Sequence, residues 1–161
     1  GNGDFKLVTN LMKRVALRSK VRTNTLLYDT YDVKEGETPE MLADKLYGDS
    51  NLHWIIMYVN GITDRYHQWP LSTPQFLAFV NDKYSNPDGT HHYEITQTSG
   101  DTTVTIDIGS DNTSHGDATL VTNYEYEVSR QDTLRKIRLL DSAYVDQFVE
   151  EFENLIGASV L

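Results

Sequence analysis

Hydrophobic and polar positions alternate after residue 30 in a way that predicts a strand, a tight turn and a helix. Tyr31 and Val33 alternate with polar neighbours, which is the period of a half-buried strand. Gly36 can adopt the positive φ that a tight turn requires. Thr38 can cap a helix whose first residue, Pro39, needs no N–H at that position. We expect this unit to be the scaffold of the chain.

A second short helix follows and ends at Asn60. Gly48 separates it from the first helix, because glycine suits the left-handed residue that stops a helix. The second helix is apolar on nearly all sides, with one stripe of Leu52, Ile55, Ile56 and Val59 and another of Trp54, Met57 and Tyr58. Such a helix must be covered on more than one side. We expect segment 61–131 to supply the cover, and a partner subunit is the alternative.

The pattern also predicts an amphipathic helix near each end of the chain. Residues 4–18 place Leu7, Leu11 and Val15 on one stripe, which packs either on the body of the protein or on another subunit. Residues 142–156 form the clearest amphipathic helix, and Gly157 is a natural stop. We expect this last helix to pack on the core, with an exposed partner helix as the alternative.

The middle of the chain predicts a loop, a helix and a small antiparallel sheet. Residues 61–71 read as an ordered loop anchored by Tyr66 and Trp69. Ser72 and Gln75 form a capping box, which begins a helix that ends near Tyr84. The remaining pattern predicts a hairpin at 92–108, a polar loop at 109–118, a third strand at 124–128 and a further strand at 133–140.

Charge is unevenly distributed along the 161 residues, whose net charge is −10. Residues 1–27 hold six basic residues and one acidic residue, a balance of +5, so the remainder carries −15. An acidic body disfavours nucleic acid. The basic arm, with Lys13, Arg14 and Arg18 as candidate contacts, docks either on its own body or on an acidic neighbour, or else it is a solvated face.

Ten tyrosines and two tryptophans favour a protein partner, because both residue types are frequent at interfaces. Cysteine is absent, so there is neither a disulfide framework nor a thiolate site. No apolar run approaches the roughly 20 residues of a membrane span, so we expect no membrane association.

Catalytic and metal-binding patterns are weak. His91 and His92 are adjacent, so we expect them to point in opposite directions on a strand. The acidic run 107–117 resembles a calcium loop only in composition, because it lacks the spacing and the closing glutamate of an EF-hand. No nucleophile elbow or phosphate loop is present. We therefore expect no catalytic residue, no metal site and no cofactor.

The opening unit resembles a LysM module. In that family a βααβ unit begins with a Tyr-x-Val-x-x-Gly-(Asp/Glu)-Thr strand and turn, has Tyr-Gly-Asp after its first helix and commonly closes its second helix with Asn. The matching residues here are Tyr31, Val33, Gly36, Glu37, Thr38, Tyr47, Gly48, Asp49 and Asn60. The resemblance implies a second strand that pairs with the first.

Three further segments narrow the resemblance: Asn10 to Arg14, Tyr66 to Trp69, and LRKIRLL at 134–140 before the last helix. Together they are similar to the LysM-containing baseplate wedge protein family of contractile-tailed (T-even-like) bacteriophages. That family usually has a further N-terminal segment, so we expect the start to be truncated.

The resemblance predicts an α+β fold with a LysM-like βααβ core. Residues 134–140 would pair antiparallel with residues 28–34, because no suitable strand follows Asn60 directly. The expected organisation is a basic helical arm (1–27), a core (28–60 and 132–141), an insertion with a loop, a helix and a β-hairpin or small sheet (61–131), and a C-terminal amphipathic helix (142–161).

Two functions follow from the resemblance. The first is a structural virion subunit of the tail baseplate, assembled in the host cytoplasm, which connects wedge components and neighbouring wedges. Its partners would be other baseplate wedge proteins, with Tyr66, Trp69, the basic arm and the acidic rim of the last helix as candidate contacts. The alternative is a peptidoglycan-binding LysM module. The insertion argues against glycan binding, because it should obstruct or rebuild the sugar groove.

Overall fold

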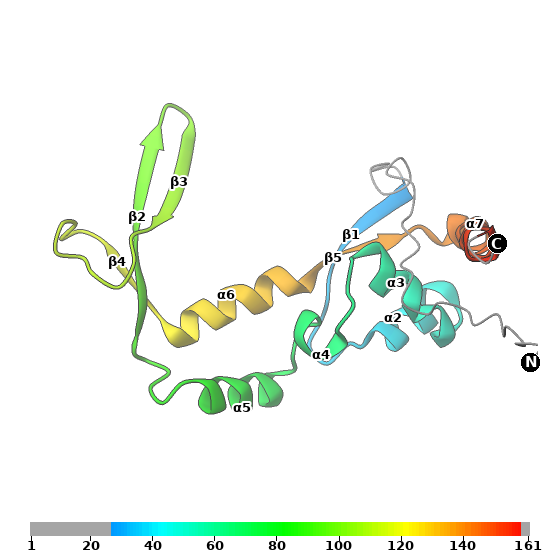
Figure 1. Cartoon of the computed structure of the whole chain (residues 1–161), viewed down its shortest axis with the longest axis horizontal. Coiled ribbons are helices and arrows are strands. Elements are labelled where there is room, and N and C mark those ends of the chain that lie inside the picture. The colour runs from blue at the N-terminus through cyan, green and yellow to red at the C-terminus, as the bar shows by residue number, and fades with distance from the viewer. Residues whose placement is uncertain (1–26, 159–161) are drawn as a thin grey trace, which may run out of the picture. The chain divides into compact units, whose positions relative to one another are not determined.

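The computed structural model describes residues 27–158 and shows an α+β protein (Figure 1). Its strands are β1 (Tyr28–Asp32), β2 (Thr90–Ser99), β3 (Thr102–Asp107), β4 (Thr119–Thr122) and β5 (Lys136–Leu140). Its α-helices are α2 (Pro39–Tyr47), α3 (His53–Val59), α4 (Arg65–Gln68), α5 (Thr73–Lys83), α6 (Asn123–Arg135) and α7 (Val145–Ala158). Two 3-10 turns, Ser50–Leu52 and Ser142–Tyr144, precede α3 and α7. The basic arm and its predicted helix at 4–18 lie outside the described residues.

The described chain divides into two compact units. The first contains residues 27–31, 38–61 and 138–158, and the second contains residues 32–37 and 62–137. Strands β1 and β5 form a two-stranded sheet, and β3, β2 and β4 form a three-stranded sheet in that order.

The predicted pairing of the first strand with residues 134–140 is confirmed, because β1 pairs with β5. Asp141 N donates to Leu27 O, and Val33 N donates to Arg135 O, each at 2.9 Å. Partner numbers fall along one strand as they rise along the other, so the strands are antiparallel. The strand itself begins at Lys136, since residues 133–135 belong to α6.

The predicted signals around α2 are present in the structure. The Thr38 hydroxyl accepts from Met41 N, and Pro39 is the first helical residue. Gly36 and Gly48 have φ angles of 74° and 73°, which residues that carry a Cβ rarely adopt. Asp49 caps the following 3-10 turn by accepting from Asn51 N. Local sequence therefore fixes both ends of α2.

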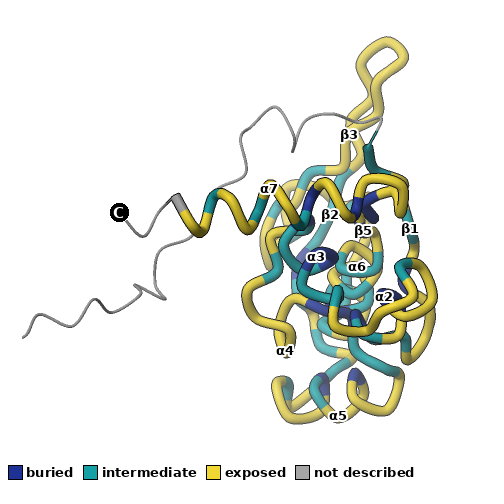
Figure 2. Tube along the Cα trace, turned by 90° about the vertical axis from the view of Figure 1, so that its right-hand side faces the viewer, coloured by how far each residue is buried: buried dark blue, intermediate teal, exposed yellow. Residues whose placement is uncertain are grey.

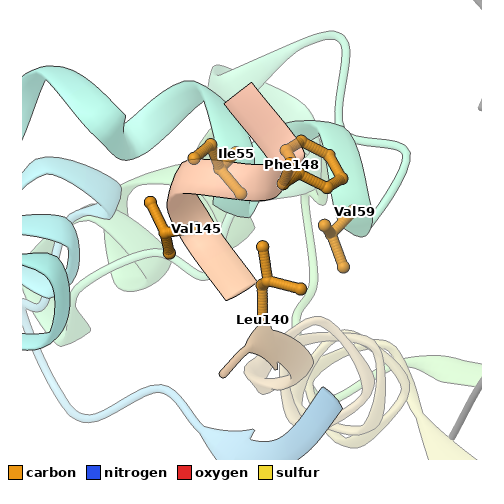
Figure 3. Close-up of a cluster of buried hydrophobic side chains, with 5 residues drawn as sticks. All are labelled: Ile55, Val59, Leu140, Val145 and Phe148. Carbon is orange, nitrogen blue, oxygen red and sulfur yellow. The ribbon is translucent and has the colours of Figure 1, made fainter. Parts of the chain in front are cut away.

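Helix α3 carries the core of the first unit. Ile55 and Val59 pack with Leu140, Val145 and Phe148, and all five side chains are buried (Figure 3). The second apolar stripe of α3 is covered by aromatic rings of α7: the ring centroids of Trp54 and Tyr58 lie 4.6 Å and 5.3 Å from that of Phe152. The rings that cover this stripe thus belong to α7, whereas we expected the 61–131 segment to cover it.

In the second unit, α5 begins as predicted. Gln75 Oε1 accepts from Ser72 N at 3.1 Å within a capping box, and the helix ends at Lys83 before Tyr84. The predicted hairpin is also confirmed: β2 and β3 pair antiparallel from Glu94 opposite Asp107 to Ser99 opposite Thr102. Helix α4 occupies part of the predicted loop at 61–71.

The predicted third strand at 124–128 is wrong, because these residues lie in α6. Tyr124, Tyr126 and Val128 alternate with polar residues, which reads as a strand. A capping box overrides that pattern: Thr122 Oγ1 accepts from Glu125 N, and Glu125 Oε2 accepts from Thr122 N. The third strand is β4, which pairs with β2 just before the cap. The last helix is close to its prediction of 142–156. It differs at its end, because α7 continues through Gly157, the predicted stop, to Ala158.

Candidate functional site

The Asn60 side chain binds both backbone groups of Arg138 on β5. Asn60 Nδ2 donates to Arg138 O at 2.7 Å, and Arg138 N donates to Asn60 Oδ1 at 2.8 Å. Asn60 Nδ2 also donates to Ile56 O, which anchors the amide to the end of α3. Asn60 thereby links α3 to the outer edge of β5.

Tyr47, the last residue of α2, makes a similar contact. Its hydroxyl donates to Leu140 O at 3.0 Å, and burial raises its pKa to about 12 although that hydrogen bond acts in the opposite direction. Tyr47 and Tyr31 both line an open groove of about 270 Å³. Asp29 and Asp141 are its charged lining residues, so the groove favours cationic or hydrogen-bonding groups.

The loop after β1, residues 33–37, accepts hydrogen bonds from residues that follow α4 in the sequence. The loop and these residues belong to the same unit, the second. Trp69 Nε1 donates to Glu37 O at 2.8 Å, and Thr73 N donates to Glu35 Oε1 at 2.6 Å. Arg135 Nη1 donates to Val33 O at 3.1 Å. The hydrogen bond from Thr73 N lowers the pKa of Glu35 below its usual value, and the guanidinium of Arg135 acts in the same direction.

The two aromatic residues predicted as partner contacts have different environments. Trp69 is buried, with 6% of its surface exposed, and its indole N–H serves the loop after β1. Tyr66 on α4 is 85% exposed. This placement leaves Tyr66 as the available aromatic side chain of the pair.

The charged candidates are only partly within the described residues. Lys13, Arg14 and Arg18 lie outside them. The acidic rim of α7 is exposed at Asp146, Glu150, Glu151 and Glu153. The apolar stripe of α7 becomes more exposed along the helix, from the buried Phe148 to Ile156 at 38%.

The prediction that His91 and His92 point in opposite directions is wrong. The β2–β4 pairing has an irregularity between Thr90 and His92, which brings the two Nδ1 atoms to 2.8 Å. His92 Nε2 also lies 2.9 Å from Glu94 Oε1, and the His91 ring stacks on Tyr126 with centroids 3.7 Å apart. A bulge changes which face a residue occupies, so simple alternation fails here. Residues 27–158 contain no group of three or more His, Cys, Asp or Glu side chains arranged to hold a metal ion.

A buried carboxylate in the second unit gave no sequence signal. Glu127 on α6 is 1% exposed, and its Oε1 lies 2.6 Å from Lys83 Nζ and 2.8 Å from the Tyr84 hydroxyl. Arg130 lies 3.7 Å from Oε2. Burial raises the pKa of Glu127, but the hydrogen bonds from Lys83 and Tyr84 outweigh burial and the pKa is lowered. This cluster joins α5 to α6.

These sites consist of strand clamps, a polar groove and exposed surfaces. Within the described part of the chain, no helix combines the length and apolar character needed to cross a membrane.

Comparison with known proteins agrees with a structural role. The family model described as base plate wedge protein 53 matches residues 5–104. The chain is also 23% identical over 145 residues to the baseplate wedge protein gp53 of Enterobacteria phage T4. The matched region covers 81% of this chain and 74% of that protein. Because the family model spans more than half of the sequence, the chain belongs to the base plate wedge protein 53 family.

Proposed function

We propose that the protein is a structural subunit of a phage tail baseplate wedge, which connects wedge components and neighbouring wedges during tail assembly. The observation that carries this proposal is the family match over residues 5–104. Its partners are other baseplate wedge proteins, and it acts through shape and charge complementarity, without catalysis, nucleic acid or membrane. Its place is the virion baseplate, after assembly in the host cytoplasm.

We further propose that its core is LysM-like, formed by residues 28–60 and 132–141, with residues 61–131 as an insertion. The pairing of β1 with β5 supports this proposal. So do the contacts of Tyr47 and Asn60 with the backbone of Leu140 and Arg138, because both side chains are at LysM motif positions.

Glycan binding is the alternative function, and the loop after β1 argues against it. In LysM modules the sugar groove borders this loop. Here the loop accepts hydrogen bonds from Trp69 Nε1 and Thr73 N, so these acceptors are already used by the protein. A glycan would have to displace the buried Trp69 indole to reach Glu37 O.

Among the candidate contacts, the exposed Tyr66 and the acidic rim of α7 are proposed as partner surfaces. Lys13, Arg14 and Arg18 remain proposed contacts from sequence. A tyrosine combines apolar area with a hydrogen-bonding group at low entropic cost, which suits an interface anchor.

Co-expression with the other wedge proteins of the same phage tests the function. We expect a stable complex in size-exclusion chromatography, weakened by Tyr66→Ala and retained with Tyr144→Ala, another exposed tyrosine. Absence of any complex with the wild-type chain would contradict the wedge role. Saturable, salt-resistant retention on peptidoglycan would instead favour the glycan alternative.

A further inference from the structure

The hairpin of β2 and β3 extends beyond the part of its sheet that β4 covers (Figure 1). Strand β4 pairs with β2 only between Thr90 and Glu94, so residues 95–106 form two strands with their connecting turn. No residue of β3 is buried, and the end of the hairpin is exposed throughout (Figure 2). Two strands alone are marginally stable in water, so this part of the chain gains from a further layer or strand.

The three apolar side chains of residues 95–106 lie on one face of the hairpin, here called its apolar face. The register places Ile95 opposite Ile106, and Val104 opposite Gln97, on the same face. Val104 is 51% exposed, and the two isoleucines are only partly buried. The other face carries threonines. The apolar side chains therefore lie beside an edge that is accessible to another chain.

The outer edge of β3 has no partner strand within residues 27–158. Ile108 N donates to Tyr93 O and Tyr93 N donates to Gly109 O, so both backbone groups of Tyr93 face the β3 side and Tyr93 is a hydrogen-bonded position of β2. Because bonded and non-bonded pairs alternate, the N–H and C=O groups of Thr103 and Thr105 point away from β2. These groups are positioned to bind an added strand.

The charge of Asp107 at the end of β3 is the only charge in this edge strand. Proteins commonly place lysine, proline or a bulge there to prevent pairing. Strand β3 reads TTVTID, which contains neither lysine nor proline and is rich in β-branched residues. Such a sequence favours pairing with another strand.

Charge identifies the kind of partner. Residues 90–122 contain five acidic residues and no lysine or arginine. Two of them lie at the ends of β3: Asp101 directly precedes the strand, and Asp107 is its last residue. A second copy paired antiparallel through its own β3 would bring these carboxylates together, whereas a basic segment would be attracted to them.

We propose that the outer edge of β3 docks an extended segment of a partner protein that carries lysine or arginine, by addition of a strand to this sheet. The main-chain groups of Thr103 and Thr105 bind its backbone, the apolar face takes its alternate side chains, and Asp101 and Asp107 select its charge. This inference assigns a particular surface to the proposed wedge function. It rests on that function only because the peptides used to test it are taken from tail proteins.

The test uses an array of overlapping peptides from all tail proteins of the same phage, this chain included, probed with the full protein. We expect binding to basic, β-branched peptides. Thr105→Pro removes an outward N–H without removing a hairpin hydrogen bond, so it should weaken binding about tenfold. Thr105→Val keeps the N–H and should retain binding. Amide exchange at Thr103 and Thr105 should slow when a selected peptide is bound.

Asp101→Lys is a second variant that does not depend on how proline is tolerated, and it should weaken the same peptides roughly threefold. The proposal is overturned if no peptide binding responds to these two variants, if the binding peptides are acidic, or if they come only from this chain. If whole wedge proteins form a complex equally with wild type and Thr105→Pro, the wedge function stands and this inference fails.

Discussion

The side-chain carboxamide of Asn60 binds the backbone N–H and C=O of Arg138, as a neighbouring strand would. The residues are 78 positions apart, and both backbone groups of Arg138 are bound. The Tyr47 hydroxyl donates to one such group, Leu140 O, which lies 93 positions further along the chain. These side chains explain why a two-stranded sheet can be stable here: its outer groups on β5 are satisfied by helix-borne side chains rather than by a third strand.

Asn60→Ala should lower the free energy of unfolding by about 1–2 kcal/mol, because two backbone groups of β5 lose their partners. The measurement is urea denaturation followed by circular dichroism. Asn51→Ala is the matched control, since Asn51 bonds only locally to Asp49. Equal stability of the two variants would show that the clamp contributes nothing.

Glu127→Gln should destabilise the protein at pH 7 by about 1–3 kcal/mol, because a buried charged acceptor is lost from Lys83 and Tyr84. The pKa of Glu127 is lowered from its usual 4.5, so its contribution is present above that pH and is lost as pH falls through the folded-state pKa. The difference between wild type and variant should therefore shrink below pH 4.5.

Denaturation curves at several pH values between neutral and acidic conditions measure this effect. Glu150→Gln, which changes an exposed carboxylate on α7, is the matched control. A wild-type advantage over Glu127→Gln that persists undiminished under acidic conditions would contradict the assigned role.

Among the elements, α6 shows where pattern reading fails. Its only buried residue is Glu127, so the helix has no apolar stripe that would predict it. Its tyrosines alternate with polar residues and mimic a strand. The cap at Thr122 and Glu125 was the available signal, of the same kind that correctly predicted α5. Caps and turns are local and readable from sequence, whereas the buried ion cluster of α6 depends on partners on α5.

Thr122→Ala should destabilise the second unit by about 1 kcal/mol, since α6 loses the hydroxyl that accepts from Glu125 N. Thr122→Ser keeps a hydroxyl and should be near wild type. Amide hydrogen exchange in the first turn of α6 is the measurement. If the two variants exchange alike, the cap does not hold this turn.

For the whole molecule, the resemblance to a LysM module, which calls for a second strand beside the first, led to the strand LRKIRLL and predicted the β1–β5 pairing. The covering of α3 by α7 could not be predicted. An amphipathic stripe indicates that a helix is covered, but it does not identify the element that covers it. Likewise, the LysM motif positions were readable, but the backbone groups bound by Tyr47 and Asn60 were not. Their partners follow from the register of a strand far along the chain.

Replacement of residues 96–105 by Asn-Gly, which forms tight hairpin turns, should leave thermal unfolding of the first unit unchanged. That segment contains no buried residue. A chain that ends at residue 131 should instead lose this unit, because Leu140, Val145 and Phe148 are removed from its core. Circular dichroism and the fluorescence of Trp54 and Trp69 distinguish the two cases. A cooperative, native-like transition in the shortened chain would contradict this account.

The β1–β5 pairing also sets an order of events during synthesis on the ribosome. The second unit is mostly contiguous, so most of it can form while translation continues. The first unit must wait until β5 and α7 emerge, more than a hundred residues after β1. An interrupted translation product therefore exposes the apolar faces of α3, and exposed apolar surface of this kind favours removal by chaperones and proteases.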